Sequence, residues 1–405
     1  MYKLILNLFA DTQVTTQPSL SAEMKTFYDM RLIDEASPML VHEQFGQKRP
    51  IPQGSGKTIE FRKFSPLPKA LVPLTEGVTP NGNSLEVTAV TATVEQFGDY
   101  IVQSDILELT ALDNTILEST KLLGKQAGLT MDTVVRNILN SGTNVSYAPK
   151  ISGSTETEVT SRKDLDKTAK LTVDVVQRMV AKLRAQNAPT INGDYVAVIH
   201  PYVAYDLMRD PEWIDAHKYA TPENIYTGEI GKLGGVRFVQ TTEAKIFAPK
   251  LKGKVKTAVS SANKSISVEG TLTEMSGVNI PCYLAGTANT ITGIAKASEG
   301  VYTVTLGTAA TAAVGDVLAD REGTASGLAV FSCLFIGEGA YGVTEVSGGG
   351  LQTIIKQKGS SGTADPLDQR SSVGWKGLKT AKILVDNYLV RCEVCSRYSD
   401  TASAN

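Results

Sequence analysis

The sequence predicts an α+β protein that joins one long helix, an extended two-stranded arm and a separate β-rich unit. Three observations support this prediction. Apolar residues recur at spacings of three, four or their multiples between Leu109 and Ile138, which is the period of a helix. Two runs, residues 58–64 and 85–95, alternate apolar and polar side chains as strands do. From residue 248 to 327, Thr, Ala, Ser, Val and Gly dominate, which favours short strands and tight turns.

Length and charge restrict the class of protein. The chain has 405 residues, which is long for one compact core and suggests two or three domains. Its 40 Lys and Arg residues and 42 Asp and Glu residues give a net charge of -2, which argues against a dedicated nucleic-acid binder. No apolar stretch is long enough for a membrane helix, so no membrane partner is expected. Four Cys residues favour a reducing setting over a disulfide scaffold.

The first part of the chain is expected to form an ordered arm followed by two strands. The apolar start is interrupted by Asn7, so a signal peptide is not favoured. The strands are Thr58–Phe64 and Leu85–Glu95. The apolar face of the second strand changes sides halfway, which predicts a bulge or strong twist near Ala89.

The connection between the two strands, residues 65–84, is too long for a tight turn and too apolar for free solvent. A two-stranded arm cannot bury both of its faces by itself, so we expect this arm to lie on another subunit. For the lysines, a solvated strand face remains the alternative interpretation. The expected inter-subunit contact residues are Lys63, Pro66, Leu67, Lys69, Leu71 and Leu74.

The long helix follows Phe97–Asp105 and is expected to span roughly 50 Å at about 1.5 Å per residue. Thr110 and Asp113 form a possible capping pair, and Gly142 is a natural residue to end the helix. Gly124 and Gly128 lie inside the helix and predict a bend or a close neighbour. The predicted apolar stripe comprises Leu109, Leu112, Ile116, Leu123, Ala127, Val134 and Ile138.

The next segment predicts an α/β lobe. Thr172–Gln186 has helical spacing with Thr172 as a plausible N-cap, and Tyr195–Ile199 is a buried strand that His200-Pro201 ends. A short helix and a further strand, Tyr202–Met208 and Lys232–Val239, follow. Residues 248–327 then predict a small β-sandwich or barrel inserted into the lobe. Strand character resumes at Val330–Val346, and Thr380–Val394 is expected to be one long closing strand.

No constellation of residues predicts an active site, so no enzyme, cofactor or metal is expected. The three His residues are far apart in the sequence, and Cys392-x-x-Cys395 lacks a second ligand pair for zinc. That pair is interpreted as two half-buried thiols at a strand end. Gly54-Ser-Gly-Lys-Thr58 lacks the first glycine of a phosphate-binding loop and precedes a strand.

The order of these elements resembles the major capsid proteins of tailed bacteriophages, which share the HK97-like fold. Three stretches carry the resemblance: Phe97–Asp105, which looks like the entry into the spine helix, then Asp194–Pro201 and Gln369–Lys376. The resemblance covers residues 20–247 and 330–398 and looks closest to the N4-like phages.

The resemblance implies a division of the chain into the parts of that fold. The family's lysine–asparagine crosslink cannot be placed on residues of this chain. The implied parts are an N-terminal arm (1–55), an E-loop with P-domain strands (56–103), a P-domain with the spine helix (104–170), a first part of the A-domain (171–247), an inserted β domain (248–327), an A-domain return (328–365) and a P-domain closing strand with the C-terminus (366–405).

The implied function is self-assembly of pentamers and hexamers into an icosahedral head shell around double-stranded phage DNA. The implied partners are a separate scaffolding protein, a portal protein, a decoration protein and DNA bound without sequence specificity. The implied location is the virion capsid, after assembly in the host cytoplasm. Two alternatives fit parts of the same pattern: an encapsulin-type compartment shell, and a surface adhesin built on the β insertion.

Overall fold

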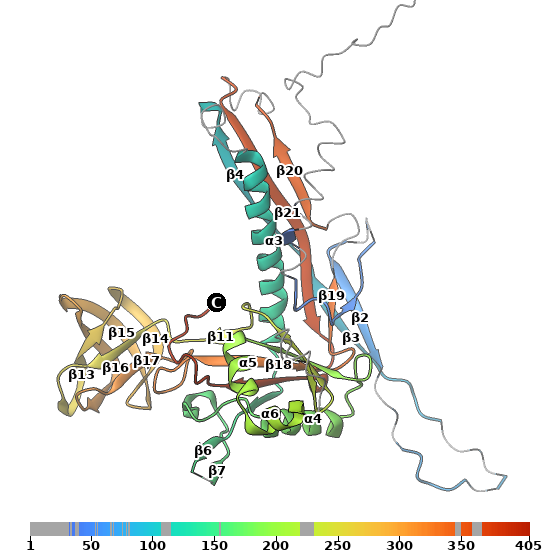
Figure 1. Ribbon diagram of the computed structural model, residues 1–405, viewed down its shortest axis with the longest axis horizontal. Helices are drawn as coiled ribbons and strands as arrows, with labels where there is room; N and C mark the ends of the chain where they lie inside the picture. The colour runs from blue at the N-terminus through green and yellow to red at the C-terminus, as the bar shows by residue number, and fades with distance from the viewer. Residues whose placement is uncertain are drawn as a thin grey trace, which may run out of the picture.

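The computed structural model has four parts, which we call the spine, the lobe, the barrel and the arm (Figure 1). It describes residues 32, 35–36, 40–52, 54, 56–64, 67, 69–74, 76–77, 79, 82–106, 115–153, 155–218, 231–344, 350–358 and 367–405. None of the helices in those ranges is long and apolar enough to cross a membrane.

The spine is a helix packed against one face of an antiparallel sheet. Its helix, α3 (Thr115–Leu139), is about 37 Å long and packs Leu123, Ala127 and Met131 against Val373 and Trp375 of the sheet. The first residues of the predicted helix and its capping pair lie outside the described residues. The spine strands on this face are β4 (Glu95–Ser104), β20 (Gln352–Lys356) and the upper part of β21 (Arg370–Ile383).

The buried face of α3 differs from the predicted stripe in its last turns. Val135 and Leu139 are fully buried there, whereas Val134 and Ile138 are half-buried. The reason is that this end of α3 contacts the lobe sheet as well as β19 and β21, so a different arc of the helix is covered.

Gly124 inside the helix and Gly142 just beyond its end both have close neighbours. A Cβ atom on Gly124 would lie 2.9 Å from the carbonyl oxygen of Leu32, so the expectation of a close neighbour is confirmed. Gly142 follows the end of the helix, but its backbone is not left-handed. Glycine is required at position 142 because Asp386 packs close to it, and the Asp386 Oδ1 would lie only 2.9 Å from an added Cβ atom.

The predicted single closing strand, residues 380–394, is wrong. The chain forms two strands that belong to different sheets, β21 in the spine and β22 (Leu389–Val394) in the lobe. A 3₁₀ turn at Asp386–Tyr388 separates them. The apolar pattern continues across the break because both sheets contribute to one buried layer between spine and lobe. A continuous apolar pattern does not distinguish one long strand from two shorter strands in different sheets.

The lobe is a mixed sheet covered on both faces. Helices α4 (Val173–Ala185), α5 (Pro201–Met208) and α6 (Pro211–Lys218) belong to the lobe, and α4 and α5 pack on one face, while the end of α3 contacts the other. All five residues of the central strand β8 are buried, as its apolar run predicts. The strand order is β5 (Val145–Tyr147), β22, β18 (Val330–Ile336), β8 (Tyr195–Ile199), β10 (Val236–Gln240) and β9 (Lys232–Leu233), with β11 (Ile246–Phe247) beside β18.

One predicted helix cap in the lobe is confirmed, and a second cap lies at His200, where the sequence predicts only the end of a strand. Thr172 caps α4, because its side chain accepts a hydrogen bond from the backbone N–H of Val175. His200 caps α5 in the same way, with its Nδ1 accepting from the backbone N–H of Tyr202 at 3.2 Å. His200 therefore ends the strand through a backbone contact, as expected.

The arm consists of β2 (Thr58–Phe64) and β3 (Val87–Thr93), which pair along seven consecutive positions from Thr58↔Thr93 to Phe64↔Val87. The bulge predicted near Ala89 is therefore wrong, whereas the strong twist given as its alternative stays a prediction. The apolar side chains that suggested a change of face, Leu85 and Val87, are simply exposed in the isolated chain.

The inserted β unit is a closed six-stranded barrel with its own apolar core, and it projects from the lobe (Figure 1). Its strands run from residue 252 to 320, inside the predicted range of 248–327. The strands are β12 (Lys252–Val255), β13 (Val259–Gly270), β14 (Met275–Leu284), β15 (Thr287–Ser298), β16 (Val301–Ala312) and β17 (Val317–Asp320).

The remaining described elements are short. The lower end of β21 pairs with β19 (Tyr341–Thr344), which pairs in parallel with β1 (Gln47–Lys48). The hairpin of β6 (Lys150–Ser152) and β7 (Thr155–Thr157) projects from the lobe, and a 3₁₀ turn covers Arg162–Asp164.

Candidate subunit interface

The base of the arm is firmly attached to the molecule. Phe61 is buried, and a Cβ atom on Gly342 of β19 would lie only 2.6 Å from its ring. Ala92 and Val94 are buried beside it, and the backbone N–H of Val94 donates to the carbonyl of Lys57 at 2.9 Å. Glycine at position 342 therefore makes room for the ring that fixes the direction of the arm.

The far end of the arm exposes apolar side chains instead of burying them. The exposed fractions are 81% for Leu71, 85% for Val72 and 78% for Leu74, and Leu67 is 59% exposed. We call residues 67–79 the arm tip. Large apolar side chains that stay this exposed favour an interaction site at the arm tip.

The structure brings only part of the predicted contact set together. Leu67, Leu71 and Leu74 share the arm tip with the exposed Lys69. Lys63 lies further back, on β2, where it pairs with Thr88. Pro66 and the side chain of Lys63 lie outside the described residues.

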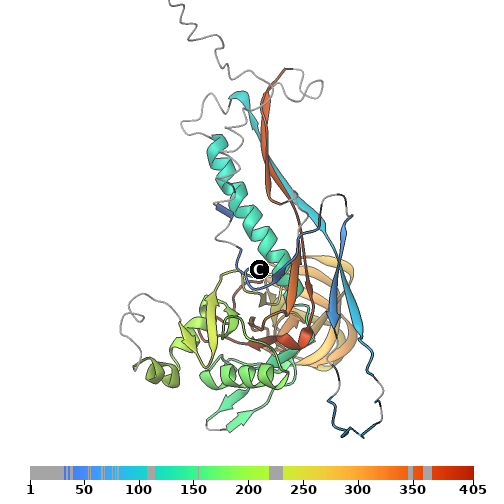
Figure 2. The same ribbon diagram turned by 90° about the vertical axis from the view of Figure 1, so that its right-hand side faces the viewer.

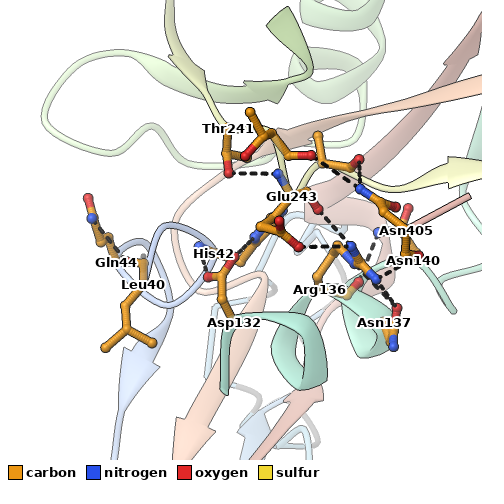
Figure 3. A network of polar contacts seen from close by, with 12 residues as sticks. Leu40, His42, Gln44, Asp132, Arg136, Asn137, Asn140, Thr241, Glu243 and Asn405 are labelled. Atoms are coloured by element: carbon orange, nitrogen blue, oxygen red, sulfur yellow. Dashed lines mark hydrogen bonds and ion pairs between the residues drawn. The ribbon is translucent and has the colours of Figure 1, made fainter. Parts of the chain in front are cut away.

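A buried polar network that no sequence pattern indicates holds the chain before the arm against α3 (Figure 3). Asp132 accepts two hydrogen bonds from His42, one from the backbone N–H and one at the ring Nδ1, each at 2.7 Å. Both side chains are fully buried. The Tyr341 hydroxyl donates to the carbonyl of His42 at 2.5 Å. These residues are 90 or more positions apart, so no spacing rule indicates the contact.

Arg136, one turn further along α3, extends this network to the lobe (Figure 3). Its guanidinium donates to the carbonyl of Glu243 at 2.9 Å and to that of Asn405 at 3.1 Å. Burial lowers the pKa of Arg136, and the nearby Glu243 and Asp132 carboxylates oppose that shift. Asn140 continues the contact, because its Oδ1 accepts from the hydroxyl of Ser332 at 2.5 Å. The orientation of the spine on the lobe is therefore fixed by hydrogen bonds as well as packing.

A second buried ion cluster supports the neck of the barrel. Glu393 is fully buried and accepts two hydrogen bonds from Arg162, at 2.7 and 2.6 Å. Arg391 lies 3.0 Å from the same carboxylate, and burial lowers the pKa of Arg391. Arg162 also donates to the carbonyl of Glu322 at 3.3 Å, just beyond the last barrel strand. The barrel is thereby held against the lobe.

The cysteines are placed for packing. All four are free and buried. Burial raises the pKa of Cys392 and of Cys395 to about 12, so neither is a thiolate at neutral pH. Across the strands, Cys392 pairs with Cys333 rather than with Cys395. Within the described ranges, no group of three His, Cys, Asp or Glu residues is placed to hold a metal ion.

The fold is that of tailed-phage capsid shells, the HK97-like class. The chain is similar to the capsid protein in the asymmetric unit of cyanophage Pam1, with a TM-score of 0.55, 11% identity and 100% of each chain covered. It is also similar to the capsid of cyanophage P-SCSP1u, with a TM-score of 0.53, 12% identity and coverage of 97% and 94%. For the capsid of Ralstonia phage GP4 the values are 0.52, 12%, and 98% and 99%.

The family follows from a separate comparison. The family described as phage capsid protein matches residues 20–274, which is more than half of the chain. The chain therefore belongs to the phage capsid protein family. No curated protein sequence matches it.

This membership establishes the coarse function. The protein is a major capsid protein, a structural protein that self-assembles into a shell and is located in the virion capsid. The alternatives of an encapsulin-type compartment or a surface adhesin are not favoured. The relation to the N4-like phages stays a prediction.

Proposed function

We propose that the shell is the icosahedral head of a tailed phage, built from pentamers and hexamers around double-stranded DNA, and that each arm lies over a neighbouring copy. The observation that carries this proposal is the arm tip, whose leucines are 59–81% exposed in the isolated chain. A second copy that covers them removes apolar surface from water. Full burial of one leucine contributes about 1.5–3 kcal/mol before the cost of ordering the tip.

The proposed contact residues are Lys63, Pro66, Leu67, Lys69, Leu71 and Leu74, as the sequence predicts. The proposed domain division keeps the arm and spine together as E-loop and P-domain, and the lobe as A-domain around the five-fold and six-fold axes. The pairing of β22 with lobe strands supports placing residues 389–394 with the lobe. The N-terminal arm would run under another neighbour.

The proposed partners are a separate scaffolding protein, a portal protein and a decoration protein, with assembly in the host cytoplasm. The barrel is the proposed outward-facing site for decoration or for contacts between capsomers. Its projection from the lobe supports this placement (Figure 1). Contact with DNA would be local and without sequence specificity, in line with the net charge of -2. The proposed role involves no catalysis.

The test is deletion of residues 66–83, the segment that contains the exposed leucines. We expect a soluble protomer that forms no closed shells by negative-stain electron microscopy. A matched control replaces the same residues with a Gly-Ser segment of equal length, which keeps the reach of the arm and removes its apolar side chains. Normal shells from either variant would contradict the proposed role of the arm.

A further inference from the structure

The barrel joins the lobe through two chain connections, residues 248–251 and 321–329. They lie against each other, because a Cβ atom on Gly323 in the second connection would be only 2.7 Å from the Cδ of Pro249 in the first. Two adjacent connections form a hinge unless a contact outside them fixes the unit that they carry. The orientation of the barrel, which projects from the lobe in Figures 1 and 2, therefore depends on what holds the two connections to the lobe.

The guanidinium of Arg162 contacts both ends of this hinge and the core of the lobe. Its central carbon lies 3.6 Å from the centre of the Phe247 ring, and Phe247 is the residue before the first connection. It donates to the carbonyl of Glu322, in the second connection, at 3.3 Å. It also donates twice to the buried carboxylate of Glu393 on β22, at 2.7 and 2.6 Å. One side chain thus ties both connections to a central strand of the lobe.

Two further contacts at this place support Arg162. The backbone N–H of Ala325 in the second connection donates to the carbonyl of Lys163 at 2.9 Å, and Lys163 follows Arg162 in the same 3₁₀ turn. Lys250 lies 3.9 Å from Glu322, but both side chains are exposed, and exposed ion pairs contribute little. The turn that begins at Arg162 is therefore the principal contact of the lobe with the second connection.

Glu393 has a second basic partner that does not reach the second connection. The Nε of Arg391 lies 3.0 Å from the Glu393 Oε1, and the guanidinium of Arg391 donates to the carbonyl of Asn140, just after α3. Glu393 therefore keeps a cation beside it when Arg162 is absent. This lessens the penalty for an unpaired buried charge, so the contacts of Arg162 can be lost without unfolding of the lobe.

We propose that Arg162 is the positioning residue that fixes the barrel on the lobe, and that loss of its contacts lets the barrel rotate about its two connections while the lobe stays folded. This inference goes beyond the proposed function, because it concerns the single protomer and holds whichever partner the barrel meets. A barrel fixed in this way presents its outer surface at one angle to the lobe.

The test measures rotation of the barrel by time-resolved fluorescence anisotropy of the unassembled protomer at nanomolar concentration. A maleimide dye is attached at Val314→Cys on the barrel and, in a separate sample, at Gln177→Cys on the outer side of α4, because both native side chains are exposed. The four native cysteines are buried and react little. A barrel that moves independently gives the dye at position 314 a shorter rotational correlation time than the dye at position 177.

We expect the two dyes to report the same correlation time when the rest of the chain is wild type. Arg162→Met should shorten the time at position 314 several-fold and leave the time at position 177 unchanged. The matched control is Arg391→Met, which also removes one arginine from Glu393 but keeps Arg162 on both connections. In that control the dye at position 314 should rotate with the whole molecule.

Three results would overturn the proposal: free rotation of the barrel in the wild-type background, an unchanged correlation time in folded Arg162→Met, or equal shortening in Arg162→Met and Arg391→Met. A second variant, Arg162→Met combined with Glu393→Gln, covers the case in which Arg162→Met alone does not fold. It removes the buried charge but does not restore the contacts with the connections, so its barrel should rotate freely. A fixed barrel in this double variant would also overturn the role of Arg162.

Discussion

At the scale of single residues, the contact between His42 and Asp132 ties the chain before the arm to the spine helix. Asp132 provides both acceptors, and no water-exposed alternative exists for the donors of His42 because both side chains are fully buried. The other ring nitrogen of His42, Nε2, has no hydrogen-bond partner among the described residues. The site is therefore sensitive to any further loss of partners.

The substitution Asp132→Ala is expected to lower the free energy of unfolding of the protomer by about 3 kcal/mol, because it leaves buried donors unpaired. Urea denaturation followed by circular dichroism measures the change. The control on the same helix is Glu118→Ala, an exposed carboxylate, which should cost less than about 1 kcal/mol. Similar losses in the two variants would contradict the role of the buried pair.

Protonation of the His200 ring is expected to make the stability of the protomer depend on pH. Its Nδ1 accepts the capping hydrogen bond of α5, which requires an unprotonated ring nitrogen, and burial lowers its pKa from 6.5 to about 4. A lowered pKa in the folded state means that its contribution is complete above the unfolded pKa of 6.5. That contribution is lost as the pH falls towards 4.

The urea midpoint of the unassembled protomer should therefore fall between pH 6.5 and pH 4. In His200→Asn, which keeps a capping side chain without a titrating ring, part of that fall should disappear. An identical fall in both proteins would show that the lost stability comes from other groups.

Sequence reasoning at this scale worked where a contact is local. Thr172 could be predicted as a capping residue because its partner, Val175, lies three positions along the chain. The contact of His42 with Asp132 joins residues 90 positions apart and depends on how the chain before the arm crosses α3. The distances between the three histidines along the sequence do not indicate where the chain before the arm crosses α3.

At the scale of elements, the barrel behaves as a closed unit. Its core residues form one cluster that is separate from the cores of lobe and spine. Its two chain connections lie side by side, because Lys252 pairs with Ala319 and the backbone N–H of Asp320 donates to the carbonyl of Leu251 at 3.0 Å. A closed barrel also has no free strand edge that needs a partner.

Replacement of residues 253–319 by a two-glycine linker should therefore leave the spine and lobe folded. We expect the urea midpoint of the remaining protein to change less than it does in Asp132→Ala. In a parallel preparation, residues 250–322 alone should give a dispersed NMR spectrum. An unfolded remainder would show that the barrel supplies stability to the lobe.

Helices and strands were predicted correctly where one apolar pattern packs against one surface. The boundaries of α4, β8 and the barrel follow from periodicity and composition. It failed at residues 380–394, where two strands of different sheets share an apolar pattern, and near Ala89, where the apparent change of face reflects exposed side chains. Both failures come from surfaces whose partner is not visible in the local sequence.

At the scale of the whole molecule, the arm and the spine sheet leave apolar area open to water while the net charge stays near zero. A charge placed on the arm tip should therefore prevent association more strongly than a charge elsewhere. Leu71→Asp is expected to abolish shell formation, as measured by light scattering and negative-stain microscopy. Val314→Asp provides a matched control, because Val314 is 66% exposed on the barrel, and it should assemble normally. Equal effects of the two substitutions would contradict a specific role of the tip.

The order of an arm, a long helix, an α/β lobe and an inserted β unit, taken together with the resemblance of three stretches, was sufficient to predict the HK97-like fold and the capsid family. The row that Gly374 forms with Tyr100 and Ile354 across the spine sheet could not be predicted, because Tyr100 and Ile354 are more than 250 positions apart in the sequence.

The strand β21 runs from the tip of the spine to the lobe and pairs with β4 at ten consecutive positions and with β19 at its lower end. A pull along the spine thus strains covalent backbone and ten residue pairs in shear, all at the same time. Under internal pressure in an assembled particle, β21 and its partner strands would resist as one unit, because the hydrogen bonds between them are loaded together rather than broken one after another.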